Sequence, residues 1–141
     1  MRQQRSGFNP YLQDSCHTHD GFVLYGSKAG IKDSTFYDAS GGWHDASDYL
    51  QYSTTSANAT YHLLMAYRDF PNTFRDEKQA NGLDGKNGMA DVLDEAKWGL
   101  DWLLKMHPKE NIMFNQLADD RDHLSMRIPK EDSQYGKGFE R

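Results

Sequence analysis

Two amphipathic segments, separated and flanked by long polar stretches, most constrain what this chain can fold into. Residues 89–106 place apolar side chains three and four positions apart, the period of an α-helix, and Pro108 ends this segment. The second predicted helix runs from near Ser47 to about Asp69, ahead of Pro71. The predicted apolar faces are Met89, Val92, Leu93, Ala96, Leu100, Leu103 and Leu104 in one helix, and Tyr49, Leu50, Ser53, Ala57, Tyr61 and Leu64 in the other.

Two helices cannot bury each other's apolar faces and also support so much loop, so these faces need further helices. The small residues Ser53, Ser56 and Ala57 would let a neighbouring helix approach closely. At 141 residues the chain has the length of one ordinary domain. We therefore expect residues 1–141 to form part of a larger all-α architecture.

Composition excludes several classes of protein. The net charge is −5 with scattered basic residues, which argues against a nucleic-acid partner. The sequence has no apolar run long enough to span a membrane and no apolar core of a signal peptide near Met1. One cysteine allows no intramolecular disulfide. The 3 Trp, 8 Tyr and 7 Phe could form a core or a surface on which sugar rings stack.

A cluster of potential metal ligands ends the first polar stretch. Cys16, His17, His19 and Asp20 lie within five consecutive residues, and thiolate and imidazole are the ligands that zinc prefers. Their spacing is not that of a zinc finger. The alternatives are therefore a metal site and a polar loop with one buried thiol.

The stretch GGWHDASDYLQY, residues 41–52, holds two carboxylates three positions apart, Asp45 and Asp48. If a helix begins here, this spacing places both side chains on one side of its first turn. The positive end of the helix dipole would keep them ionised, as suits a general base that activates water. The alternative is that one of them simply caps the helix.

The acidic residues of the segment 89–106 have a structural explanation. Asp91, Asp94 and Glu95 fall in the first turns, where the helix dipole favours negative charge. Asp101 and Lys105 have the spacing of a helical ion pair. We therefore do not assign this cluster to catalysis.

Several segments together resemble glycoside hydrolase family 9, the inverting endoglucanases and their relatives. GGWHDASD is similar to the GGWYDAGD signature of that family, and residues 87–106 are similar to its PDILDEIKWGLDYLLKM helix. Residues 115–123 resemble a QVGDG…DH segment. Gln4 to Gly7 with Cys16-His17 resemble an N-terminal QRCG…CH run. The matches follow the family's order along nearly the whole chain.

The resemblance implies a fold and a set of site residues. The fold would be part of an (α/α)6 barrel, with residues 1–141 as the N-terminal part of one catalytic domain. Asp48 would be the general base, Asp45 its partner in holding the water, and His123 a residue lining the glucan cleft. Trp43 and Tyr49 would flank the site and bind substrate.

The resemblance also implies a structural zinc site and no organic cofactor. Some members bind zinc through four ligands, two cysteines and two histidines. Cys16, His17 and His44 match three of these positions, and Ser6 stands in place of the other cysteine. His19 or Asp20 could replace that ligand.

The implied reaction is cleavage of a β-1,4-glucan polysaccharide or oligosaccharide with inversion. The general-acid glutamate would come from the remainder of the catalytic domain, because no glutamate of this chain lies in a matching context. The alternatives are an inactive glycan-binding fragment and a zinc-stapled structural fragment. By resemblance we expect a secreted or periplasmic protein.

Overall fold

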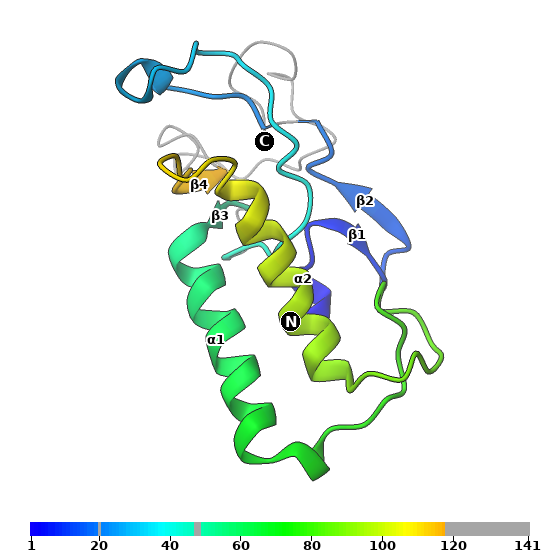
Figure 1. Ribbon diagram of the computed structural model, residues 1–141. Helices are drawn as coiled ribbons and strands as arrows, with labels where there is room; N and C mark the ends of the chain where they lie inside the picture. Colours follow the sequence, from blue (N-terminus) through cyan, green and yellow to red (C-terminus); the bar gives the residue numbers. More distant parts are fainter. Residues whose placement is uncertain (20, 47–48, 118–141) are drawn as a thin grey trace.

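The computed structural model describes residues 1–19, 21–46 and 49–117. Its two α-helices, α1 (Ser53–Asp69) and α2 (Asp91–Met106), lie side by side and run in opposite directions (Figure 1). The other elements are short: η1 (Arg2–Gln4), β1 (Gly7–Asn9), β2 (Asp14–Cys16), η2 (Gly26–Ala29), β3 (Gln51–Tyr52), η3 (Pro71–Thr73) and β4 (Gln116–Leu117). Over the described ranges, neither helix combines the length and apolarity needed to cross a membrane.

Of the two small antiparallel sheets, the first is a local hairpin and the second connects distant parts of the chain. In one, β1 pairs with β2, so that Gly7 lies opposite Cys16. In the other, β3 pairs with β4, with Gln51 opposite Leu117. The second sheet joins the start of α1 to the segment that follows α2 and so closes one end of the helix pair (Figure 1).

The first helix begins later than predicted. Gln51 and Tyr52 are extended because they pair with β4, and α1 starts only at Ser53. Asp45 therefore lies in a loop before a strand, and the interpretation of Asp45 as a helix cap is wrong. The predicted ends of both helices, Asp69 and Met106, are confirmed.

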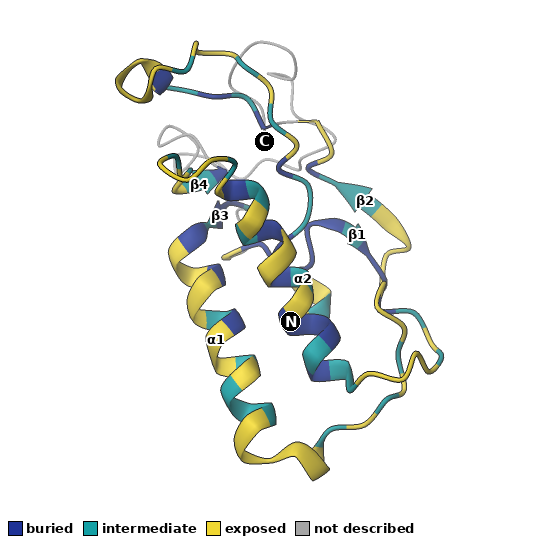
Figure 2. Ribbon diagram, viewed as in Figure 1, coloured by how far each residue is buried: buried dark blue, intermediate teal, exposed yellow. Residues whose placement is uncertain are grey.

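The face of α1 that packs on α2 is made of small polar side chains. Ser53, Ser56 and Thr60 are buried, whereas Tyr61 and Leu64 of the predicted apolar face are 57% and 44% exposed. Close approach explains this, because a Cβ on Gly99 of α2 would collide with Oγ1 of Thr60. Figure 2 shows the resulting exposed outer surface of α1.

The apolar core lies at the end of the helix pair near β4. Trp102, Met106, Ala39 and Leu117 are buried together, and Leu103 and Phe114 pack against them. The indole of Trp102 donates a hydrogen bond to the carbonyl of Ala39 at 2.9 Å. This contact ties the long loop before the GGW motif to α2.

One predicted ion pair is replaced by two others. Lys97, not Lys105, pairs with Asp101 along α2. Lys105 instead reaches Oδ2 of Asp38 at 2.8 Å and the carbonyl of Ser40 at 2.7 Å. The end of α2 is thus attached to the same loop that Trp102 holds.

Candidate active site and metal centre

The candidate site is built on a short backbone ladder between residues 4–6 and 42–44. Arg5 and Trp43 form an antiparallel bridge. The N–H of Ser6 donates to the carbonyl of Gly42 at 2.9 Å, and the N–H of His44 donates to the carbonyl of Gln4 at 2.8 Å. The ladder brings the N-terminal residues beside the GGWHDASD motif.

Gly42 allows this ladder to lie against α2. Its φ is +69°, and a Cβ there would lie 2.7 Å from the ring of Trp102. The carbonyl of Gly42 also accepts a hydrogen bond from the indole of Trp98 at 2.8 Å. A glycine is therefore required here both for the backbone conformation and for the close contact.

Trp43 faces the interior of the chain. Its side chain is 2% exposed, and its indole N–H donates to Oε1 of Glu95 at 2.7 Å. A ring enclosed in this way has no face left for a sugar. The expectation that Trp43 binds substrate is therefore corrected. The Trp43 side chain packs against α2 and supports the candidate site from that side.

Glu95 and Arg5 form a buried ion pair beneath the ladder. The guanidinium of Arg5 donates to Oε2 of Glu95 at 2.8 Å, and its carbon Cζ lies 4.3 Å from the ring centre of Trp98. Sequence reasoning attributed Glu95 to the helix dipole. The sequence did hold a signal for its burial. Glu95 has helical spacing to Val92, Gly99 and Trp102, which form the buried face of α2.

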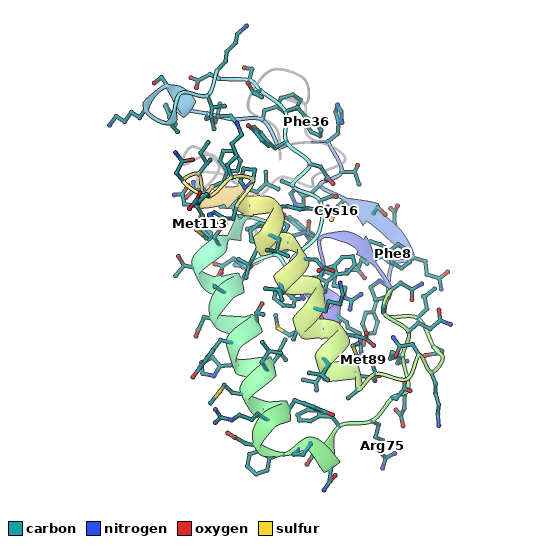
Figure 3. All side chains as sticks on the ribbon, in the orientation of Figure 1. Phe8, Cys16, Phe36, Arg75, Met89 and Met113 are labelled. Carbon is teal, nitrogen blue, oxygen red and sulfur yellow. The ribbon has the colours of Figure 1, made fainter. Side chains whose placement is uncertain are left out.

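The structure brings the three predicted zinc ligands together. Sγ of Cys16 lies 3.4 Å from Nε2 of His44, and the rings of His17 and His44 are centred 5.2 Å apart. One ligand atom from each of these residues lies within 4.8 Å of the others. Figure 3 shows Cys16 at the end of β2.

The chemistry of this cluster fits zinc. Burial, with a smaller contribution from the charge of His17, lowers the pKa of His44 to about 4, so its imidazole is neutral near pH 7. Neutral imidazole and thiolate are the forms that bind metal. Three donors are one fewer than a closed tetrahedral site requires.

Ser6 is the structural neighbour of this incomplete set. It is fully buried, precedes the residue that pairs with Cys16, and its Oγ has no hydrogen-bond partner within the described part of the chain. His19 does not join the cluster, because its ring packs on Phe36 with centres 4.9 Å apart. Asp20 lies outside the described residues.

The loop after His44 is closed on itself. The N–H of Asp45 donates to the carbonyl of Leu50 at 2.7 Å, so the motif leaves the ladder and returns to β3 within a few residues. Asp45 is exposed and accessible to water. Asp48 and His123 lie outside the described residues, so their predicted roles stay predictions.

Tyr49 connects this loop to the metal cluster. Its backbone has φ of +65°, which is uncommon for a residue with a Cβ. Its ring meets that of His44 edge to face, with centres 5.1 Å apart. His44 is thus both a member of the metal cluster and a neighbour of the candidate catalytic loop.

Comparison with known proteins identifies the family. The model of glycosyl hydrolase family 9 matches residues 1–139. The chain belongs to this family. This family 9 chain is 32% identical over 123 residues to the cellodextrinase of Butyrivibrio fibrisolvens, with 86% of the chain and 21% of that relative covered.

Solved structures agree with this assignment. A metagenome-derived family 9 endoglucanase is 35% identical with a TM-score of 0.69, over 82% of this chain and 22% of that one. A structure described as the Zn-binding triple mutant of the family 9 endoglucanase J30 is 27% identical with a TM-score of 0.62, over 82% of this chain and 23% of that one.

These matches confirm that the family 9 chain forms part of an (α/α)6 barrel. It spans between a fifth and a quarter of the length of the proteins it matches. The described residues supply one pair of antiparallel helices together with the ladder and loops at their side (Figure 1).

Proposed function

We propose that this chain is the N-terminal part of a glycoside hydrolase that cleaves β-1,4-glucan with inversion. The observation that carries the proposal is the closed loop after His44, which presents Asp45 to solvent within a motif that the family model matches. The names of the related cellodextrinase and endoglucanase support a cellulose-like substrate.

Asp48 acts as the general base in this proposal, and Asp45 helps to hold the attacking water. Inversion needs a base on one face of the sugar and a separate acid roughly 6.5–9.5 Å away, with room for water between them. The acid comes from the remainder of the catalytic domain. His123 lines the glucan cleft, and Tyr49 supports the loop that carries the base.

The remainder of the domain also covers the apolar side chains that this chain leaves exposed. Leu100 and Leu104 of α2 are 45% and 62% exposed, and Tyr61 and Leu64 of α1 face outward as well. Burial of such a surface stabilises an assembly by roughly 25 cal/mol per Å² of apolar area. We assign these faces to contacts with further helices of the barrel.

Cys16, His17 and His44 would hold a structural zinc ion, which would supply a cross-link between β2 and the motif. A secreted or periplasmic location stays a prediction. Elemental analysis of the purified complete protein tests the zinc assignment, and protein without zinc after growth in zinc-supplemented medium would contradict it.

The catalytic assignment is tested by Asp48→Ala in the complete protein. We expect release of reducing ends from a soluble β-1,4-glucan to fall at least about a hundredfold, because the water loses its base. Asp69→Ala, at the exposed end of α1 away from the motif, is the matched control and keeps activity. Near-normal hydrolysis by Asp48→Ala would remove the assignment.

Product stereochemistry tests inversion separately. Proton NMR of the first products should show the α-anomer from a β-linked substrate, and an initial β-anomer would contradict inversion. A glycan-binding fragment is the second candidate, because no glutamate of this chain lies in a context that matches the family's general acid. Glucan binding without reducing-end release would favour that candidate.

A further inference from the structure

Glu95 connects α2 to both strands of the ladder that carries the candidate active site. Oε1 accepts the indole N–H of Trp43 at 2.7 Å, and Oε2 accepts two N–H groups of Arg5, at 2.8 and 3.2 Å. Arg5 and Trp43 are directly opposed in the ladder. One carboxylate thus binds both members of a cross-strand pair, although its partners are 90 and 52 residues away in the sequence.

Strand geometry explains why this contact matters for the motif. Successive side chains of an extended strand point to opposite faces. Trp43 points towards α2, and His44 points the other way, where it meets Cys16 and Tyr49. Any rotation or slip of residues 42–44 that released Trp43 would also move His44, and Asp45 directly after it.

The contact is a fixed one. Glu95 is 4% exposed and Arg5 is fully buried, so water does not replace either partner. Arg5 is held from two further sides, by the ring of Trp98 and by the carbonyl of Ala80, which accepts from Nη1 at 3.1 Å. A buried charge pair with this many partners tolerates one arrangement, because a shift would leave buried donors and acceptors without partners and could leave a buried charge unpaired.

We infer that Glu95 is a positioning residue for the glucan-cleaving reaction, acting through Trp43 and Arg5 to set the backbone that carries His44 and Asp45. The inference rests on the proposed function for its catalytic consequence. Glu95 does not touch substrate. It fixes the ladder from the helix side, opposite the metal cluster.

Glu95→Gln in the complete protein is the central variant. Both oxygens of Glu95 face N–H donors, so one orientation of the amide sets an NH₂ group against Arg5 and the other sets it against Trp43. We expect kcat on soluble β-1,4-glucan to fall about tenfold or more, with KM changed less than about threefold, because the reacting groups are displaced while the sugar-binding surface is kept.

Asp94→Asn is the matched control. Asp94 is the adjacent residue of α2 and is also 4% exposed. Its Oδ2 accepts a hydrogen bond from Asn87, which belongs to the loop before the helix and not to the ladder. A purely structural role for Glu95 predicts that both variants lower the melting temperature and leave kcat unchanged below it. The positioning role predicts that only Glu95→Gln lowers kcat.

A double-mutant cycle with Trp43→Phe tests whether Glu95 acts on kcat through Trp43. When the indole N–H is absent, the amide introduced by Glu95→Gln can turn its oxygen to Arg5 without setting one donor against another. The effects of Glu95→Gln and Trp43→Phe on kcat should therefore combine to much less than their product. Multiplicative effects would overturn the inference.

Hydrogen exchange separates this inference from the proposed function. The N–H groups of Ser6 and His44 are donors within the ladder. They should exchange about tenfold faster or more in Glu95→Gln than in Asp94→Asn, whether or not the protein hydrolyses glucan. Unchanged exchange would overturn the inference, and absence of hydrolysis by the unmodified protein would overturn only the proposed function.

Discussion

Cys16 and His44 are 28 residues apart in the sequence, yet Sγ of the first lies 3.4 Å from Nε2 of the second. This contact joins the end of β2 to the residue that directly precedes Asp45. Because the ring of Tyr49 also packs on His44, one imidazole connects the candidate metal centre with the candidate catalytic loop. The candidate metal centre and the GGWHDASD motif are therefore one structural unit.

Ser6→Cys should complete the metal centre. Ser6 is buried beside the strand that pairs with Cys16, and a thiolate there would supply a fourth ligand. We expect the affinity for Zn²⁺ to rise about tenfold or more. Competitive titration against a chromophoric chelator measures the change.

The control for this prediction is Ser15→Cys. Ser15 precedes Cys16 in β2, and its side chain points to the opposite face of that strand. It should leave zinc affinity unchanged. Equal gains in Ser6→Cys and Ser15→Cys would show that an added thiol binds zinc without completing the site.

Arg5→Met should destabilise the fold strongly. It leaves the buried carboxylate of Glu95 without its main positive partner, which typically costs about 3–5 kcal/mol. Arg2→Met is the comparison, because Arg2 is partly exposed, pairs mainly with Asp91 at 3.3 Å and lies farther from Glu95, at 3.6 Å, so its loss should cost only about 1 kcal/mol. Urea denaturation of both variants checks the difference, and similar losses would contradict the burial argument.

Gly99→Ala should also be destabilising, although alanine favours helices. The gain in helix propensity is about 1 kcal/mol. The new methyl group would collide with Thr60 and the ring of Trp43, and such overpacking costs typically about 1–3 kcal/mol or more. We therefore expect a net loss of stability, and a lower kcat because Trp43 is displaced.

Thermal unfolding and glucan hydrolysis of Gly99→Ala are the measurements. Lys97→Ala, at an exposed position of the same helix, should change stability by less than about 0.5 kcal/mol. A Gly99→Ala protein more stable than its parent would show that the helices can separate at no cost.

Asp38→Asn should give a loss of stability that depends on pH. Burial opposes ionisation of Asp38, but hydrogen bonds from Lys105 and Ser40 outweigh it and lower its pKa to about 2. A lowered pKa stabilises the fold above the unfolded value of 3.8, and this stabilisation is lost as the pH falls towards 2. Since Asp38 is mostly exposed, we expect at most about 1 kcal/mol at pH 7.

Melting temperatures between pH 3 and pH 7 test this prediction. The difference between parent and Asp38→Asn should shrink below pH 4. Lys105→Met should have little further effect in the Asp38→Asn background, because the shared ion pair is already lost. A difference that is constant with pH would assign the effect to packing instead of charge.

Much of the helical framework was predictable from local pattern. The period of apolar residues and the prolines that follow located both helix ends, Asp69 and Met106. The start of α1 was not predictable, because Gln51 and Tyr52 pair with residues after α2. Local spacing cannot reveal a strand whose partner is so distant in the sequence.

The sequence by itself determined the family, the order of its motifs and the residue types available for chemistry, since these follow from residues close together along the chain. Only the tertiary structure decided that Trp43 faces inward and that Ser6 lies beside the strand paired with Cys16. It also decided that Glu95 holds Arg5 and Trp43 instead of merely facing the helix dipole. The physical reason is that a buried carboxylate needs partners, and the ladder that brings them is closed by backbone hydrogen bonds between distant segments.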